Sequence, residues 1–145
     1  MRASMLVIDA NIGVKLVALE PGRDEVFSRI KDEAELVAPD WLLVEAGHAL
    51  WRKAKLGEID RAKAEAALLA LPGFFESIES VTPLIAKAQR LAFELDHWIY
   101  DCLYLALATD REAVLLTADK KFANAAKRAG YGDTVELLTW ASQAL

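Results

Sequence analysis

The sequence predicts an α/β fold in which a parallel β-sheet is flanked by helices on both faces. Three observations predict it: short apolar runs of strand length, helical stretches between them, and Gly, Pro or Asp residues where the elements change. Parallel strands need long, right-handed crossover connections, and the helical stretches are long enough to supply them. We expect the whole chain, 1–145, to form a single domain, because 145 residues is an ordinary length for one domain.

Breaks and caps divide the first half of the chain into two strands and four helices. Pro21-Gly22 ends the first helix, and Pro39 stops the second strand. Asp40 and Asp60 are typical N-cap residues for the two helices that follow. The expected strands are 5–8 and 35–38, and the expected helices are 12–19, 23–31, 40–57 and 60–71.

The second half continues the alternation with three strands and three helices. Thr82-Pro83 combines an N-cap residue with proline at the first helical position. Gly130 fits the position just after a helix, where a left-handed backbone is common. The expected strands are 75–81, 113–117 and 135–138, and the expected helices are 82–95, a following helix that carries Asp101, and 119–129.

Composition limits the chemistry that the protein can perform. The net charge of −5 argues against loose, charge-driven binding to nucleic acid, because such affinity comes from lysine and arginine, but it is compatible with a selective nuclease. Cys102 is the only cysteine, so no internal disulfide can form. With two histidines besides, a structural zinc site of the Cys/His type is excluded, and a bound metal would be held mainly by oxygen.

Hydropathy predicts a cytoplasmic protein without a membrane segment. The longest apolar stretch, around Asp101, is shorter than the roughly 20 residues that span a bilayer, and the first residues lack the apolar region of a signal peptide. The apolar share of 54% is nevertheless high. It predicts that part of the surface is covered by a second copy or by another protein.

Four carboxylates stand in apolar surroundings: Asp9, Glu45, Asp101 and Asp119. Removing an ionised carboxylate from water costs several kcal/mol, so such residues need hydrogen bonds, cationic partners or a metal ion. Asp9 and Asp119 follow predicted strands, and the carboxyl ends of parallel strands meet at the edge of the sheet where ligands bind. The arrangement favours a metal, because Mg2+ prefers oxygen ligands and is bound through a few carboxylates together with substrate phosphate.

Each carboxylate also has a structural interpretation. Asp9 and Asp119 are equally suited to cap the helices that follow them. Taken alone, Glu45 fits a solvated helix face that includes His48. Asp101 lies in a helix that is apolar all round and therefore buried, where a hydrogen bond from Tyr104 or a pairing with His97 is the alternative to a metal.

At these residues the sequence resembles the PIN-domain family, and within it the VapC-like toxins of bacterial toxin–antitoxin pairs. The matching pieces, in family order, are Val7-Ile-Asp9-Ala-Asn11, Leu43-Val-Glu45, Tyr100-Asp101-Cys-Leu-Tyr-Leu-Ala-Leu-Ala108 and Leu116-Thr117-Ala-Asp119-Lys-Lys-Phe122. The resemblance implies a ribonuclease that depends on Mg2+ or Mn2+. It further implies a set of acidic metal ligands and catalytic residues with polar support, namely Asp9, Glu45, Asp101 and Asp119, supported by Thr117 or Asn11. Asp96 is either a further acid near the site or the N-cap of the helix that carries Asp101.

The same resemblance implies an RNA substrate, a small antitoxin protein as partner and a homodimer. The aromatic residues Trp41, Trp51, Phe74, Phe75 and Trp98 are expected to lie in the core. Their alternative role is an exposed groove for the amphipathic tail of an antitoxin, which would bind as a helix lies in a groove.

Other classes fit the sequence less well. A phosphatase of the haloacid dehalogenase type needs a second Asp where this chain has Asn11, and a phospho-receiver domain needs a lysine that Thr117-Ala-Asp119 does not supply. Two alternatives stay open: a non-enzymatic interaction module with a PIN-like fold, and a PIN nuclease that is not a toxin.

Overall fold

A five-stranded parallel sheet forms the centre of the molecule. The computed structural model describes residues 4–31 and 34–141, and its strands lie side by side in the order β3-β2-β1-β4-β5. The strands are β1 (Met5–Ile8), β2 (Glu35–Pro39), β3 (Ser77–Glu79), β4 (Val114–Thr117) and β5 (Val135–Leu137). All four strand pairs are parallel, so the predicted α/β class and parallel sheet are confirmed.

Strand β1 is the middle of the sheet. Val7 pairs with Val37 of β2 on one side and with Leu115 of β4 on the other. Leu6, Val7 and Ile8 are almost completely buried. A strand covered on both faces needs apolar residues at successive positions, which explains why the segment reads as a continuous apolar run and does not alternate.

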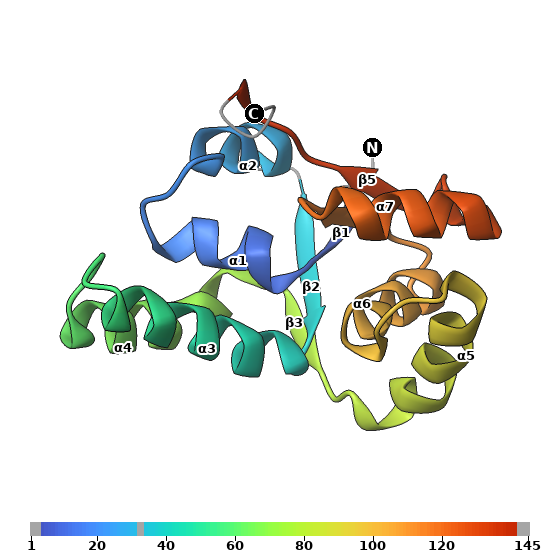
Figure 1. Ribbon diagram of the computed structural model, residues 1–145, viewed down its shortest axis with the longest axis horizontal. Coiled ribbons are helices and arrows are strands. Elements are labelled where there is room, and N and C mark those ends of the chain that lie inside the picture. The colour runs from blue at the N-terminus through green and yellow to red at the C-terminus, as the bar shows by residue number, and fades with distance from the viewer. Residues whose placement is uncertain (1–3, 32–33, 142–145) are drawn as a thin grey trace.

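Helices cover both faces of the sheet, as Figure 1 shows, with α1, α3 and α4 on one side and α5 and α6 on the other. The α-helices are α1 (Ala10–Val17), α2 (Arg23–Ile30), α3 (Trp41–Lys55), α4 (Arg61–Ala70), α5 (Ile85–Leu95), α6 (Ile99–Asp110) and α7 (Lys120–Ala126). Shorter turns occupy η1 (Leu71–Phe74), η2 (Thr82–Leu84) and the π-type η3 (Lys127–Tyr131). None of the helices in the described part of the chain is long and apolar enough to cross a bilayer.

Helix α6 is the main buried helix. Residues 102–108 are all buried, and the helix contacts β1, β2 and β4. This agrees with the prediction that a helix apolar all round lies in the core. Asp101 stands at its first turn, at the boundary between this core and the end of the sheet.

Two predicted helix caps, Thr82 and Asp96, are wrong, and Asp40 occupies the N-cap position of α3 without a capping hydrogen bond. The Asp40 carboxylate accepts the backbone N–H of Val81 at 3.1 Å and so ties the start of α3 to the segment after β3. Thr82 begins the 3-10 turn η2, and α5 starts only at Ile85. Asp96 is not the N-cap of α6 but the C-cap of α5, with a left-handed backbone (φ 50°). The Asp60 cap is confirmed, because its carboxylate accepts the Lys63 N–H at 2.8 Å.

The prediction that five aromatic residues lie in the core is wrong for three of them. Trp51, Phe74 and Trp98 are exposed, whereas Trp41 and Phe75 are partly buried and pack against the core. The exposure of these large rings agrees with the expectation of apolar surface that a partner covers.

The C-terminal segment packs on the turn between α1 and α2. Gly22 has a left-handed backbone (φ 90°), and a Cβ atom at this position would lie 2.6 Å from Cε3 of Trp140. The ring of Trp140 also lies 4.4 Å from Nζ of Lys15, a cation–π distance. Glycine is therefore required at position 22 both by the turn and by the close approach of the indole.

Candidate active site

The candidate site lies at the carboxyl edge of the sheet, between β1 and β4. The chain proceeds from β1 outward to β3 and then returns to β4 on the other side of β1, so the strand order reverses at this point. Such a switch point opens a crevice beyond the strand ends. Asp9 directly follows β1, Thr117 ends β4, and Asp119 lies two residues further on.

Asp9 and Thr117 form the buried floor of the site. The Thr117 hydroxyl donates to Oδ2 of Asp9 at 2.5 Å and accepts the backbone N–H of Asp119 at 3.1 Å. Oδ1 of Asp9 accepts the Ile12 N–H at 3.0 Å, so Asp9 also caps α1. Thr117 is fully buried and Asp9 is 8% exposed. The structural and functional interpretations of Asp9 are therefore compatible, because capping uses one oxygen and the other faces β4.

Asp101, Asp119 and His97 form a second group of side chains in the site. One ligand atom from each of the three lies within 4.8 Å of the others. Nε2 of His97 and Oδ2 of Asp101 are 2.6 Å apart, and the imidazole packs against the Phe122 ring with centroids 4.9 Å apart. Asp119 caps α7 through Oδ1, which accepts the Phe122 N–H at 3.0 Å. The pairing of Asp101 with His97 thus exists together with the acidic cluster and does not replace it.

Glu45 reaches the site from α3. The Tyr104 hydroxyl donates to Oε1 of Glu45 at 2.6 Å, and Tyr104 is buried in α6. Glu45 is only partly exposed, so it does not lie on a freely solvated face. Tyr104 therefore orients Glu45, whereas the sequence pattern offered it as a donor to Asp101.

His97 belongs to the site although the sequence did not predict it, whereas Asn11 makes none of the hydrogen bonds among the site residues. His97 is absent from the predicted site residues, although its position four residues before Asp101 on the chain indicates contact. Asn11 is exposed on the first turn of α1 and takes part in none of the hydrogen bonds among the site residues. Of the two supporting residues that the resemblance implies, the structure places Thr117 in contact with an acid.

Burial and mutual repulsion raise the pKa values of three carboxyls. Burial raises the pKa of Asp9 to about 7, opposed by the hydrogen bonds from Thr117 and Ile12 and increased by the charges of Asp101 and Glu45. Burial likewise raises the pKa of Glu45, with a further rise from Asp101 and a counteracting hydrogen bond from Tyr104. Burial also raises the pKa of Asp101, which His97 lowers and Asp119 raises. These acids are close enough to destabilise one another when ionised.

A divalent cation fits this donor set. In residues 4–31 and 34–141, no lysine or arginine forms an ion pair with any of the four acids. Carboxylate oxygens are the preferred ligands of Mg2+ and Mn2+, and imidazole is acceptable to several transition metals. Among the described residues the acids therefore have no lysine or arginine counter-charge, and His97 pairs with Asp101 alone. Oxygen ligands gathered in this way suit a metal centre.

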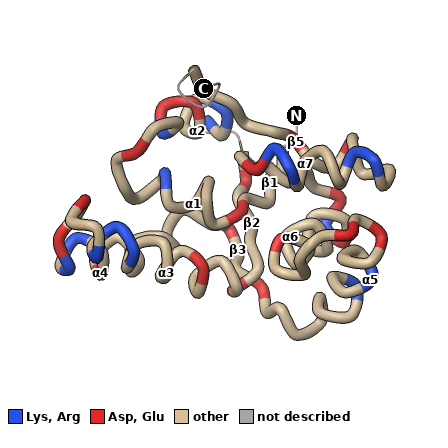
Figure 2. The backbone as a smooth tube through the Cα atoms, in the orientation of Figure 1, with Lys and Arg blue, Asp and Glu red and all other residues tan. Residues whose placement is uncertain are grey.

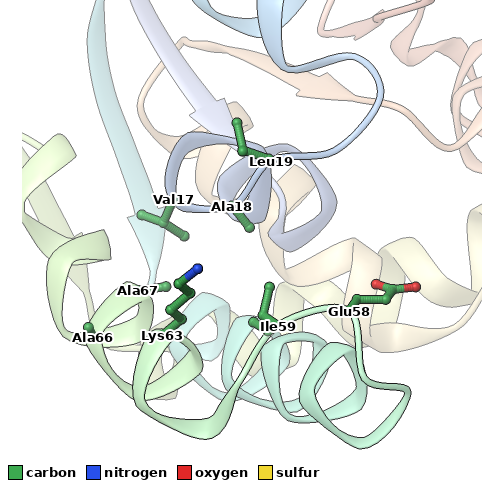
Figure 3. Close-up of a pocket in the computed structure, with 8 residues that line it drawn as sticks. All are labelled: Val17, Ala18, Leu19, Glu58, Ile59, Lys63, Ala66 and Ala67. Carbon is green, nitrogen blue, oxygen red and sulfur yellow. The ribbon is translucent and has the colours of Figure 1, made fainter.

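A pocket in another part of the molecule contains none of the four acids. It has a volume of about 560 Å3 and lies between the end of α1, the α3–α4 connection and α4. It is lined by Val17, Ala18, Leu19, Glu58, Ile59, Lys63, Ala66 and Ala67. Figure 3 shows that Lys63 extends from α4 toward Ala18, while the other α4 residues are small and apolar.

Fold and site together define a class: parallel α/β domains that gather carboxylates at the switch point of the sheet. The chain belongs to the PIN domain family, whose model matches residues 6–128. The match includes every strand end and helix that contributes an acid to the site. The family expectation from the sequence is thereby confirmed.

Curated relatives match most of the chain. Ribonuclease VapC1 of Mycobacterium tuberculosis is 35% identical over 121 residues, which cover 82% of this chain and 89% of that protein. Exonuclease VapC9 of Pyrobaculum aerophilum is 33% identical over 109 residues, covering 75% of this chain and 79% of that protein.

Solved structures share the fold. PAE2754 from Pyrobaculum aerophilum has a TM-score of 0.64 at 25% identity, covering 85% of this chain and 80% of that one. VapBC2 from Rickettsia felis, bound to a DNA fragment from its promoter, has a TM-score of 0.65 at 16% identity, covering 93% of this chain and 99% of that one. The second likeness shows the fold alone.

Proposed function

We propose that the protein is an endoribonuclease that hydrolyses RNA phosphodiester bonds with a divalent metal ion, Mg2+ or Mn2+. The observation that carries the proposal is the group of Asp101, Asp119 and His97, with Asp9 and Glu45 near enough for their charges to act on Asp101. None of the four acids has a lysine or arginine partner among the described residues. The relatives named ribonuclease and exonuclease support nuclease chemistry. Cleavage inside an RNA chain is the more specific part of the proposal.

The four acids would serve as metal ligands, and neighbouring side chains orient them. Asp9, Asp101 and Asp119, with Glu45, would bind the metal, while Thr117 fixes Asp9 and Tyr104 fixes Glu45. A bound divalent ion would lower the pKa of a water molecule and stabilise the charge that develops in a displacement at phosphorus. His97 contacts one oxygen of Asp101 and so restricts the orientation of that carboxylate beside Asp119. Burial of the floor keeps bulk water away from Asp9.

The proposal extends to a toxin that acts in the cytoplasm as a homodimer and is inhibited by a small antitoxin. Support comes from the VapC names of the relatives and from exposed apolar surface on the chain. The pocket between α1 and α4 is lined mostly by apolar side chains, with Glu58 and Lys63 as its charged residues, and Leu19 is 88% exposed. Such a surface suits the apolar face of a partner helix.

Induced expression tests the enzymatic part. We expect growth arrest and new RNA ends with the wild type but not with Asp101→Asn at matched protein levels. The control is Asp110→Asn, which changes the same residue type on the same helix where the side chain only pairs with Lys87 at 2.5 Å. This control should behave as the wild type.

The outcomes separate the alternatives. New RNA ends from Asp101→Asn at the normal rate would contradict the assignment of the acids. No new ends from the wild type would favour the non-enzymatic interaction module. RNA cleavage without growth arrest would indicate a PIN nuclease that is not a toxin. Calorimetric titration with MgCl2 and MnCl2 would identify the metal independently of cleavage.

A further inference from the structure

Two aromatic rings lie one helical turn before the hydrogen-bonded pair of Glu45 and Tyr104. Trp41 and Tyr100 stack with ring centroids 5.3 Å apart and planes 12° from parallel. Trp41 is the first residue of α3, one helical turn before Glu45, and Tyr100 immediately precedes Asp101 on α6. The stack therefore joins the two helices that carry acids of the site, where α3 begins below the end of β2 (Figure 1).

The two rings of the stack differ in exposure. Trp41 is partly buried against the core, and its indole nitrogen is shielded from solvent without a hydrogen-bond partner in the part of the chain that the structure describes. Tyr100 is 47% exposed. Packing thus fixes Trp41, and Trp41 in turn fixes one face of Tyr100 while leaving part of that ring open. A ring held in this way loses little freedom when a flat ligand stacks on it.

Because the chain carries a net negative charge, an exposed aromatic ring near the acids could supply affinity for RNA that phosphate contacts do not. The net charge of −5 is unfavourable for affinity through phosphates alone. Figure 2 shows basic residues spread over several helices, among them α2, α5 and α7 and the facing ends of α3 and α4, with acidic residues around the strand ends between them. Unpaired bases stack on aromatic rings regardless of sequence, and this stacking adds affinity where the backbone is repelled.

We propose that Tyr100, seated on Trp41, is a stacking platform for an unpaired RNA base next to the phosphate that is cleaved. This inference rests on the proposed ribonuclease function and assigns base binding to a residue outside the four acids. A base within a duplex stacks on its neighbours and cannot also cover Tyr100. Tyr100 is a positioning residue, which would hold the neighbouring phosphate near the cation that the acids are proposed to bind.

The test measures binding of a single-stranded RNA of about ten nucleotides that contains 2-aminopurine. Glu45→Gln is the background, so that the RNA stays intact. We expect Tyr100→Leu, which keeps apolar contact with Trp41 but removes the aromatic ring, to weaken binding about 10-fold and to abolish the quenching of 2-aminopurine. Tyr100→Phe should bind within about twofold of the background, because it keeps the ring.

Phe93→Leu is the matched control, since Phe93 is an aromatic residue on α5 that is 82% exposed and stacks on no other ring among residues 4–31 and 34–141. It should leave binding and quenching unchanged. Circular dichroism of each variant checks the fold. Equal affinity and equal quenching in Tyr100→Leu, or equal losses in Phe93→Leu, would overturn the inference.

Sedimentation and cleavage separate the remaining outcomes. A change from dimer to monomer in Tyr100→Leu, with quenching retained, would assign the ring to a contact between copies and overturn the inference. Cleavage of the same RNA by the protein with wild-type Glu45 is measured in parallel. If the protein with wild-type Glu45 cleaves this RNA and Tyr100→Leu leaves its KM unchanged, only the stacking inference fails. If it neither cleaves nor binds RNA, the proposed function fails with it.

Discussion

Two groups of buried charges in this molecule are compensated in opposite ways. Lys15, only 6% exposed, donates to Glu20 at 2.8 Å and to the Pro21 carbonyl at 2.8 Å, and Lys53 pairs with the other Glu20 oxygen at 2.6 Å. Burial acts to raise the pKa of Glu20, but the two lysines outweigh it and hold that pKa below its usual range. In this group the negative charge of Glu20 is matched by lysines of the same chain.

The acids at the switch point, by contrast, have no lysine or arginine partner among the described residues. Asp9, Glu45 and Asp101 all have raised pKa values, with burial as the largest cause and neighbouring carboxylates adding to it. Removing one partner of a buried ion pair destabilises the fold, because it leaves the other charge unpaired. Neighbouring carboxylates without a cation repel one another, and a bound cation would relieve that repulsion. The difference distinguishes a structural ion network from a binding site.

The largest expected effect is on activity. Glu45→Gln should lower RNA cleavage about 100- to 1,000-fold, because it removes a charge that is needed where charge develops in the reaction. The amide oxygen of Gln can still accept the Tyr104 hydroxyl, so Tm should stay the same or rise. Cleavage assays and thermal denaturation measure the two effects. A large drop in Tm would mean that Glu45 belongs to the structural kind of charge.

The corresponding change in the compensated group should affect stability. Glu20→Gln leaves Lys15 buried without a counter-charge, which should lower the free energy of unfolding by about 3 kcal/mol. Urea denaturation measures it, and RNA cleavage by the folded variant should be normal. Glu65→Gln breaks the exposed pair with Arg61 as a control and should leave the unfolding curve unchanged.

The two groups should also respond to pH with opposite signs. With metal removed by EDTA, the raised pKa of Asp9, about 7 against an ordinary 3.8, means that the unfolded chain releases its proton first as pH rises. Stability should therefore fall between about pH 4 and 7, by at most about 1.4 kcal/mol per pH unit. Asp9→Asn should flatten this fall in a urea series.

Glu20 contributes in the other direction. Its pKa is lowered, so its stabilisation is present above the ordinary glutamate value of 4.5 and is lost as pH falls below it. Stability that rose steadily from pH 5 to 7 without metal would contradict the view that the acids repel one another.

The smallest expected effect is stabilisation by the metal. MgCl2 at ten times its dissociation constant should stabilise the folded protein by about 1.4 kcal/mol, which corresponds to roughly 3–6 °C in Tm. Asp101→Asn should show little of this shift, whereas Glu20→Gln should retain it. An equal shift in both variants would point to ion binding away from the acids.

The fold and the position of two acids could be predicted because they depend on local pattern. Apolar runs give strands, and Asp9 and Asp119 follow strand ends, so their common edge follows from parallel pairing alone. The adjacency of β1 and β4 could not be predicted in this way, because strand order depends on packing between distant segments. Without it, the Thr117 hydroxyl bond to Asp9 is invisible.

Side-chain partners were the less predictable level. Asp40 and Asp96 have the residue type of an N-cap, but Asp40 binds a distant N–H and Asp96 ends a helix with a left-handed backbone. Tyr104 bonds to Glu45, which lies 59 residues away on the chain. Such choices are decided by which group is within reach after packing, and short-range pattern carries no information about it.

The bond between Thr117 and Asp9 joins residues 108 positions apart. During synthesis, Asp9 and Glu45 emerge well before Asp101 and Asp119, and β4 can join β1 only after most of the chain has been made. Contacts of such long range form late and make folding slower. A growing polypeptide therefore carries only Asp9 and Glu45 of the four acids until residues 101–119 have been made, and the pairing of β4 with β1 is the step that assembles the site.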